Sequence, residues 1–123
     1  KVAYYNMSWC TYTIPEVAHI GYLEEVAKKD EVWGSTEIIP IGNHDRSKAE
    51  DDRDGFIKVV LDKARIVIGA TIVGERAGEM LAVYSLMVTK RMNMNELMSV
   101  VYPYPTQGEL GKMMANRSYD ALL

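Results

Sequence analysis

Two tyrosine-proline pairs stand directly before a glutamate in the stretch VYPYPTQGEL, residues 101–110. A proline steers the preceding residue out of helical geometry, so Tyr102 and Tyr104 are expected to be extended and to share one face of the chain. Thr106 and Glu109 have the spacing of a capping box that begins a helix. The segment therefore combines two fixed phenol groups with a carboxylate. A rigid helix entry with aromatic packing is the structural alternative.

Other patterns that could do chemistry are incomplete. Gly74 and Gly78 lie between an expected strand and an expected helix, but GERAGE matches neither the P-loop nor the dinucleotide fingerprint, so close helix-sheet packing is the better interpretation. The acidic stretch 50–54, EDDRD, lacks the ligand spacing of a calcium loop and is interpreted as a solvated turn. His19 and His44 belong to no metal-binding or triad spacing and are interpreted as structural or exposed, so no metal site is expected.

Composition excludes several classes of protein. The 123 residues are enough for one domain, and 14 basic against 17 acidic side chains give a net charge of -3, which argues against nucleic acid binding. The apolar runs are shorter than the roughly 18 residues of a membrane span. Cys10 is the only cysteine, so an internal disulfide is impossible. No leader pattern follows Lys1, so we expect a cytoplasmic domain, and the missing initial methionine suggests a fragment.

Short strands make up much of the chain. They are expected over residues 9–12, 17–22, 35–41, 56–62 and 65–73. The last two form a hairpin through a tight connection around Lys63 and Ala64. Both are apolar at nearly every position, so both faces of the sheet are expected to be covered, by helices or by another subunit.

Helical patterns fill most of the remainder. Leu23–Asp30 is expected to form a short helix, with acidic residues early and lysines late. A long amphipathic helix follows Gly74, with its inner stripe at Ala77, Met80, Leu81, Tyr84, Met87, Val88 and Arg91. Asn95 is expected to cap a shorter helix that ends near Val101.

The last helix is expected to begin at Pro105 or Thr106. Its inner stripe comprises Leu110, Met113, Met114, Arg117 and Ala121. Methionines on these stripes favour a helix or subunit interface over a cofactor site. The fold class is therefore α+β, an antiparallel β-sheet flanked by helices.

Four ordered motifs resemble the C-terminal dimerisation domain of pyridine nucleotide-disulfide oxidoreductases, a family that includes mercuric reductase and dihydrolipoamide dehydrogenase. They cover nearly the whole chain: WCTYTIPEVAHIG (9–21), DGFIKVVLDK (54–63), IGATIVGERAGEM (68–80) and YPYPTQGE (102–109). The resemblance implies that residues 1–123 are a single dimerisation domain of a homodimeric flavoenzyme, with FAD and NAD(P) domains upstream. It also implies that FAD and NAD(P)H serve the parent enzyme and that the isolated chain binds neither and is inactive.

The resemblance assigns roles to the Tyr-Pro segment. In this family a His-Pro-Thr segment and a following glutamate enter the partner subunit's active site beside the flavin. Tyr104 stands in the place of that histidine, Pro105 and Thr106 match, and Glu109 matches the glutamate. The resemblance therefore implies Tyr104 and Glu109 as catalytic residues and Tyr104, Pro105 and Thr106 as contacts of the partner's flavin. The family often has a cis bond before this proline, and Ile14 replaces an acidic residue common before Pro15.

The tyrosine changes the chemistry. A free tyrosine titrates near pH 10 and a free histidine near pH 6.5. The pKa of the phenol is therefore about three units above neutral pH, which places the phenolate roughly 4 kcal/mol away from serving as a base. A neutral phenol can still donate a hydrogen bond to a thiolate or an oxyanion, or contact a thiolate-bound soft metal. This resembles mercuric-reductase-like members, and we expect the parent to reduce small disulfides poorly.

Two further hypotheses compete with this one. The chain could be a free-standing homodimeric interaction module in which the Tyr-Pro segment is only structural. It could also be an independent acid-base enzyme that uses Glu109, although no nucleophile or base accompanies that residue. The upstream coding sequence separates the first two hypotheses.

Overall fold

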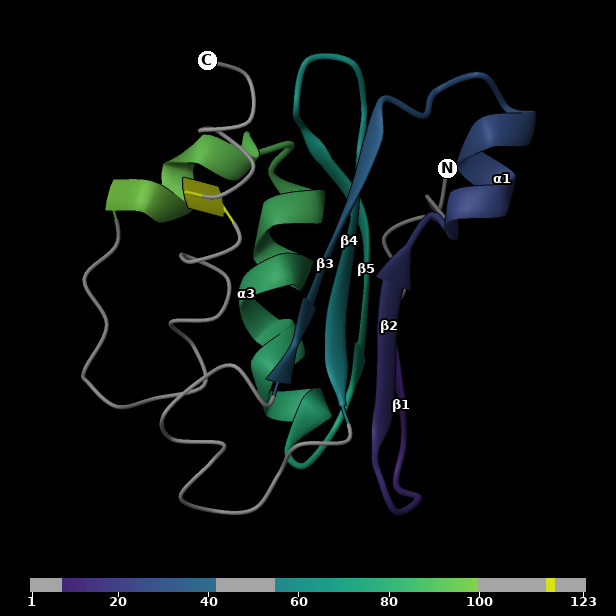
Figure 1. Ribbon diagram of the computed structural model, residues 1–123, viewed down its shortest axis with the longest axis vertical. Helices are drawn as coiled ribbons and strands as arrows, with labels where there is room; N and C mark the ends of the chain where they lie inside the picture. The colour runs from purple at the N-terminus through teal and green to yellow at the C-terminus, as the bar shows by residue number, and fades with distance from the viewer. Residues whose placement is uncertain (1–7, 42–54, 100–114, 117–123) are drawn as a thin grey trace.

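The structure is a five-stranded antiparallel sheet with helices on its two sides. The computed structural model describes residues 8–41, 55–99 and 115–116. The strand order across the sheet is β1-β2-β5-β4-β3 (Figure 1). The strands are β1 (Ser8–Thr11), β2 (Val17–Gly21), β3 (Ser35–Pro40), β4 (Phe56–Leu61) and β5 (Val67–Val73). The helices are α1 (Glu24–Lys29), α3 (Ala77–Thr89) and the 3-10 helix η3 (Met94–Ser99). The α+β prediction is confirmed.

One face of the sheet forms the hydrophobic core with α3. A row of residues in register runs from Ala18 through Ile72 and Ile57 to Ile39. All four are almost completely buried, in one cluster with Ala77, Leu81 and other residues of α3. Branched side chains suit strand positions with neighbours on both sides, and their burial provides most of the stabilisation.

The helix α3 can approach the sheet closely because a glycine lies at the contact. A Cβ added at Gly78 would come within 3.0 Å of the Cys10 sulfur, on the edge strand β1. The expected packing role of Gly78 is therefore confirmed.

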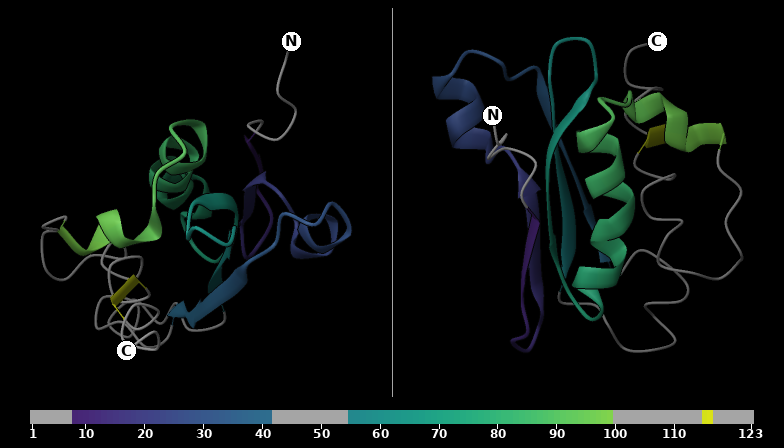
Figure 2. Two further views of the ribbon diagram at one scale, coloured as in Figure 1. Left: turned by 90° about the horizontal axis from the view of Figure 1, so that it is seen from above. Right: turned by 180° about the vertical axis from the view of Figure 1, so that it is seen from behind.

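The opposite face of the sheet is covered differently. Figure 2 shows α1 and α3 on opposite sides of the sheet, with α3 running along the strands. On the α1 side, Trp9 and Ile38 remain 51% and 48% exposed. Among the described residues, only α1 lies over this face, and it lies at one end. The second face therefore retains apolar surface that other protein could cover.

Two sequence-based boundaries were wrong. The second strand of the hairpin begins at Val67 because Arg65 has a positive φ of 67°, which interrupts the extended conformation. Arg91 does not lie on the stripe of α3, because the helix ends at Thr89 and Arg91 takes the left-handed conformation with φ of 54°. The amides of Arg91 and Met92 bond to the carbonyls of Val88 and Met87, which closes the helix with a Schellman motif.

Several sequence-based expectations fall outside the described residues. These are the polar loop of residues 43–55, apart from Gly55, and the capping box at Thr106 and Glu109. Of the last expected helix, residues 115–116 are described; they are helical, and Ala115 is fully buried in the core. Among the described helices, none is long and apolar enough to cross a membrane.

The buried row predicts unequal effects for two isoleucines. Ile72→Ala should lower the free energy of unfolding by about 2–5 kcal/mol, because it leaves a cavity in the centre of the core. Ile38→Ala, on the half-exposed second face, should cost well below that, less than about 1.5 kcal/mol. Urea titrations of both variants measure the difference, and equal losses would contradict the assignment of the two faces.

Candidate functional site

The residues assigned to the site by sequence follow η3 in the chain. Tyr104, Pro105, Thr106 and Glu109 lie outside the described residues. The structure does describe the junction that precedes them, which extends from the end of α3 through η3 to Ser99, three residues before Tyr102. The structure therefore describes the junction that leads to these residues.

The start of η3 is fixed by Asn93, and the prediction of Asn95 as the cap was wrong. The Asn93 side-chain oxygen accepts a hydrogen bond from the Asn95 amide at 2.8 Å. The Glu96 carboxylate accepts one from the Asn93 amide at 2.9 Å. These reciprocal bonds are a capping box, which satisfies donors that a helix start leaves free.

Asn95 instead contacts the turn between β4 and β5. Its side-chain oxygen accepts hydrogen bonds from Arg65 Nε at 3.0 Å and from Arg65 Nη2 at 2.8 Å. Backbone bonds add to this contact: the Met94 amide donates to the Arg65 carbonyl, and the Val67 amide donates to the Met92 carbonyl. We call the paired Arg65-Asn95 contact the fork.

The turn itself is held by an aspartate. The Asp62 carboxylate accepts hydrogen bonds from the amides of Ala64 and Ile66, both at 2.9 Å. The Asn93 side-chain amide donates to the Ala64 carbonyl at 2.8 Å. Met94 and Leu97 of η3 are buried in the core below. The hairpin turn and η3 thus form one hydrogen-bonded unit at the end of the sheet.

The glycine turn before α3 does not offer a phosphate site. The Gly78 amide, at the start of the helix, faces the Glu16 carboxylate at 3.5 Å. A carboxylate is stabilised there by the helix dipole and would repel a phosphate. A cavity of about 460 Å³ lies beside it, lined by residues that include Cys10, Glu16 and Arg76. Among the described residues, this strand-to-helix turn therefore does not fit a dinucleotide.

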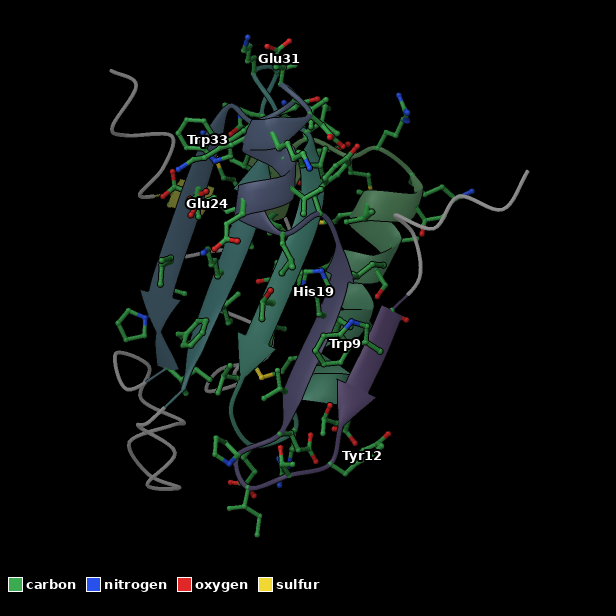
Figure 3. All side chains as sticks on the ribbon, turned by 90° about the vertical axis from the view of Figure 1, so that its right-hand side faces the viewer. Trp9, Tyr12, His19, Glu24, Glu31 and Trp33 are labelled. Atoms are coloured by element: carbon green, nitrogen blue, oxygen red, sulfur yellow. The ribbon has the colours of Figure 1, made fainter. Side chains whose placement is uncertain are left out.

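His19 has a structural role. Its Nε2 lies 2.8 Å from the Gly21 carbonyl, which can only accept, so Nε2 donates. A neutral ring then accepts at Nδ1 from the Thr71 hydroxyl, 2.7 Å away. Trp9 lies against the ring on the second face, with centroids 5.7 Å apart (Figure 3). Both ring nitrogens are engaged, which confirms the structural interpretation. Within the described part of the chain, no group of acidic, histidine or cysteine side chains could hold a metal ion.

A polar cluster attaches α1 to the second face. The Glu24 carboxylate lies 3.4 Å from Lys58 on β4 and 4.0 Å from Lys28 on its own helix. Trp33 donates to the Thr36 hydroxyl at 2.8 Å. A hydrogen bond with Thr36, followed by the charges of Lys58 and Lys28, lowers the pKa of the Glu24 carboxyl, although partial desolvation opposes the shift.

Comparison with known proteins identifies the family. The model of the family described as "Pyridine nucleotide-disulphide oxidoreductase, dimerisation domain" matches residues 7–115. The chain belongs to this family. The match extends beyond the described residues and includes the segment from Tyr104 to Glu109.

Individual relatives agree with the family assignment. A mercuric reductase of Shewanella putrefaciens is 34% identical over 85% of this chain and 19% of its own length. A dihydrolipoyl dehydrogenase of Geobacillus stearothermophilus is 31% identical over 89% of this chain and 23% of its own length. The crystal structure of LpdA from Mycobacterium tuberculosis superimposes with a TM-score of 0.89 at 25% identity, over 95% of this chain and 26% of that one. The dimerisation domain thus spans about a fifth to a quarter of these relatives.

Sequence reasoning missed the contacts of the junction. The Asn93-x-x-Glu96 spacing is a capping-box signal that the sequence does contain, and it identifies Asn93, not Asn95, as the cap. Arg65 gave no signal, because its partner Asn95 is 30 residues away in the chain.

The Glu24 cluster predicts a pH-dependent contribution to stability. The folded protein lowers the pKa of the Glu24 carboxyl, so the ionised carboxylate stabilises the fold at pH values above the pKa that Glu24 has in the unfolded chain, about 4.3. This stabilisation is lost as the pH falls through the lower pKa of the folded protein. Glu24→Gln should therefore cost up to about 1 kcal/mol at pH 7, and the difference from the unchanged protein should shrink below about pH 4. Urea titrations across this range measure it. Glu25→Gln, at an exposed neighbour, is the control, and the same pH profile for both variants would contradict the assignment.

Proposed function

We propose that this chain is the dimerisation domain of a longer, homodimeric FAD-dependent NAD(P)H oxidoreductase and that Tyr104 and Glu109 act in the partner subunit's active site. The observation that carries the proposal is the family match over residues 7–115, which includes the Tyr-Pro segment. The coverage of only 19% and 23% of the relatives' length supports flavin and nicotinamide domains elsewhere in the parent.

The chemistry assigned to this chain is hydrogen bonding by a neutral phenol. When bound in the parent, FAD supplies electron transfer from the reduced nicotinamide to the acceptor. Tyr104 donates its hydroxyl proton in a hydrogen bond to a thiolate or oxyanion at the reaction centre, without giving the proton up at neutral pH. Glu109 provides the carboxylate of the proposed pair, which in its ionised form can only accept hydrogen bonds. A donor aimed at an anion in a site shielded from water stabilises that anion strongly.

The substrate class follows from what a phenol cannot do. Reduction of a small disulfide requires a group that protonates the departing thiolate, and a histidine does this near neutral pH. Tyr104 is a poor substitute, so we propose a mercuric-reductase-like parent whose acceptor is a thiolate-bound soft metal ion. The relative named mercuric reductase, at 34% identity, supports this proposal.

Kinetics of the full-length flavoenzyme test the role of Tyr104. Tyr104→Phe should lower kcat with the true acceptor by about 10- to 100-fold, because a hydrogen bond to a charged group is lost, and KM for the nicotinamide should not change. Tyr102→Phe, at the other Tyr-Pro pair, is the matched control and should stay within about twofold. The unchanged enzyme should reduce glutathione disulfide and lipoamide slowly, and Tyr104→His should accelerate both reactions. Efficient reduction of either disulfide by the unchanged enzyme would refute the substrate proposal.

Self-association of the chain is the second test. The second face and α1 expose apolar side chains, among them Trp9, Leu23 and Ile38, each about half exposed. Such surface favours burial against further protein, here the partner subunit and the remaining domains. Static light scattering of this chain at about 50 μM should give twice the monomer mass, as expected for an interface of standard size. A monomer at that concentration would contradict the proposed homodimer.

A further inference from the structure

We infer that Arg65 and Asn95 are positioning residues, whose fork sets the orientation of η3, the helix that precedes Tyr104 in the chain. The inference rests on the proposed function, because it concerns the placement of the phenol used there.

Neither helix end at the junction requires the fork for its own hydrogen bonds. α3 is closed by its own Schellman bonds, and η3 is capped by Asn93 and Glu96. Both ends are therefore satisfied without Arg65. The two bonds from Arg65 to the Asn95 oxygen add a side-chain contact to the backbone bonds that join η3 to the β4–β5 turn. Two donors on one planar group restrict orientation as well as distance.

The backbone at Arg65 has the left-handed conformation. Its φ of 67° is a conformation that favours glycine and disfavours a long side chain. A hairpin turn would accept glycine here at lower conformational cost. The position instead has an arginine whose guanidinium reaches Asn95. An unfavourable backbone conformation retained together with a specific side-chain contact points to a function for that contact.

The fork lies close to Tyr104 along the chain. Asn95 is the second residue of η3, and Tyr104 follows the end of η3 by five residues. The Ser99 hydroxyl donates to the Glu96 carbonyl at 2.9 Å, so the last turn of η3 is also held. Only residues 100–103 separate η3 from Tyr104 in the sequence, so the orientation of η3 limits the positions that the phenol can reach. A displacement of about 1 Å at a reacting group can cost as much as 100-fold in rate.

The test uses the full-length flavoenzyme and Arg65→Gly. Glycine suits the positive φ, so the turn should persist while the fork is lost. We expect kcat with the acceptor to fall about tenfold, with KM for the nicotinamide unchanged. Hydrogen exchange of the amides of residues 94–99 should become faster. Arg76→Gly is the matched control, because it makes the same replacement at another positive φ, of 61°, before α3 and outside the junction, and it should leave kcat unchanged.

Variants of Asn95 test the same contact independently, in case Arg65→Gly does not fold. Asn95→Ala removes the acceptor and should reproduce the loss of kcat. Asn95→Asp keeps an oxygen for both guanidinium donors and should retain at least half of the original kcat. Equal losses in the two Asn95 variants, or a fall in thermal midpoint with kcat intact, would show a structural contact only and overturn the inference.

A double-mutant comparison separates this inference from the proposed function. If the fork acts through the phenol, Arg65→Gly should have little further effect in an enzyme that already has Tyr104→Phe. If Tyr104→Phe lowers kcat and Arg65→Gly does not, the positioning role alone fails. If Tyr104→Phe leaves kcat unchanged, the proposed function fails and the positioning role fails with it.

Discussion

The pairing of β5 on both sides is the interaction on which the rest of the structure depends. β5 is the middle strand, hydrogen-bonded to β2 and to β4. Its residue Ile72 is the centre of the buried row, between Ala18 and Ile57. The chain leaves β5 directly into α3, which returns over the same face and covers it. Burial of this apolar row therefore determines where α3 lies against the sheet.

The polar groups of the described residues serve mainly to join elements. Glu16 faces the start of α3, His19 links two neighbouring strands, and Glu24 attaches α1 to β4. Each is satisfied by a neighbour within the domain, so none is available as the centre of an independent reaction. This arrangement agrees with the family assignment as a dimerisation domain.

The end of the sheet where β4 turns into β5 is joined to η3, the helix that precedes the Tyr-Pro segment in the chain. The Asp62 turn, the fork and the Asn93 cap connect the sheet to η3 through successive hydrogen bonds. Rigid elements hold a reacting group more accurately than a free loop does. The role proposed for Tyr104 is to donate a hydrogen bond, and a phenol is a weak base at neutral pH, so in that proposal accurate placement is what the rest of the domain contributes.

Local patterns in the sequence determined the elements, because strand alternation, helical periodicity and turn residues act over a few neighbours. The hairpin, α1, α3 and the α+β class follow from them, and four ordered motifs indicated the family. The strand order, the covered face and the Arg65-Asn95 fork depended on tertiary structure, because they join residues as far apart as Ala18 and Ile72. The apolar pattern predicts a strand at Arg65 because nothing nearby in the sequence signals its left-handed backbone. The partner of its side chain, Asn95, is 30 residues away in the chain.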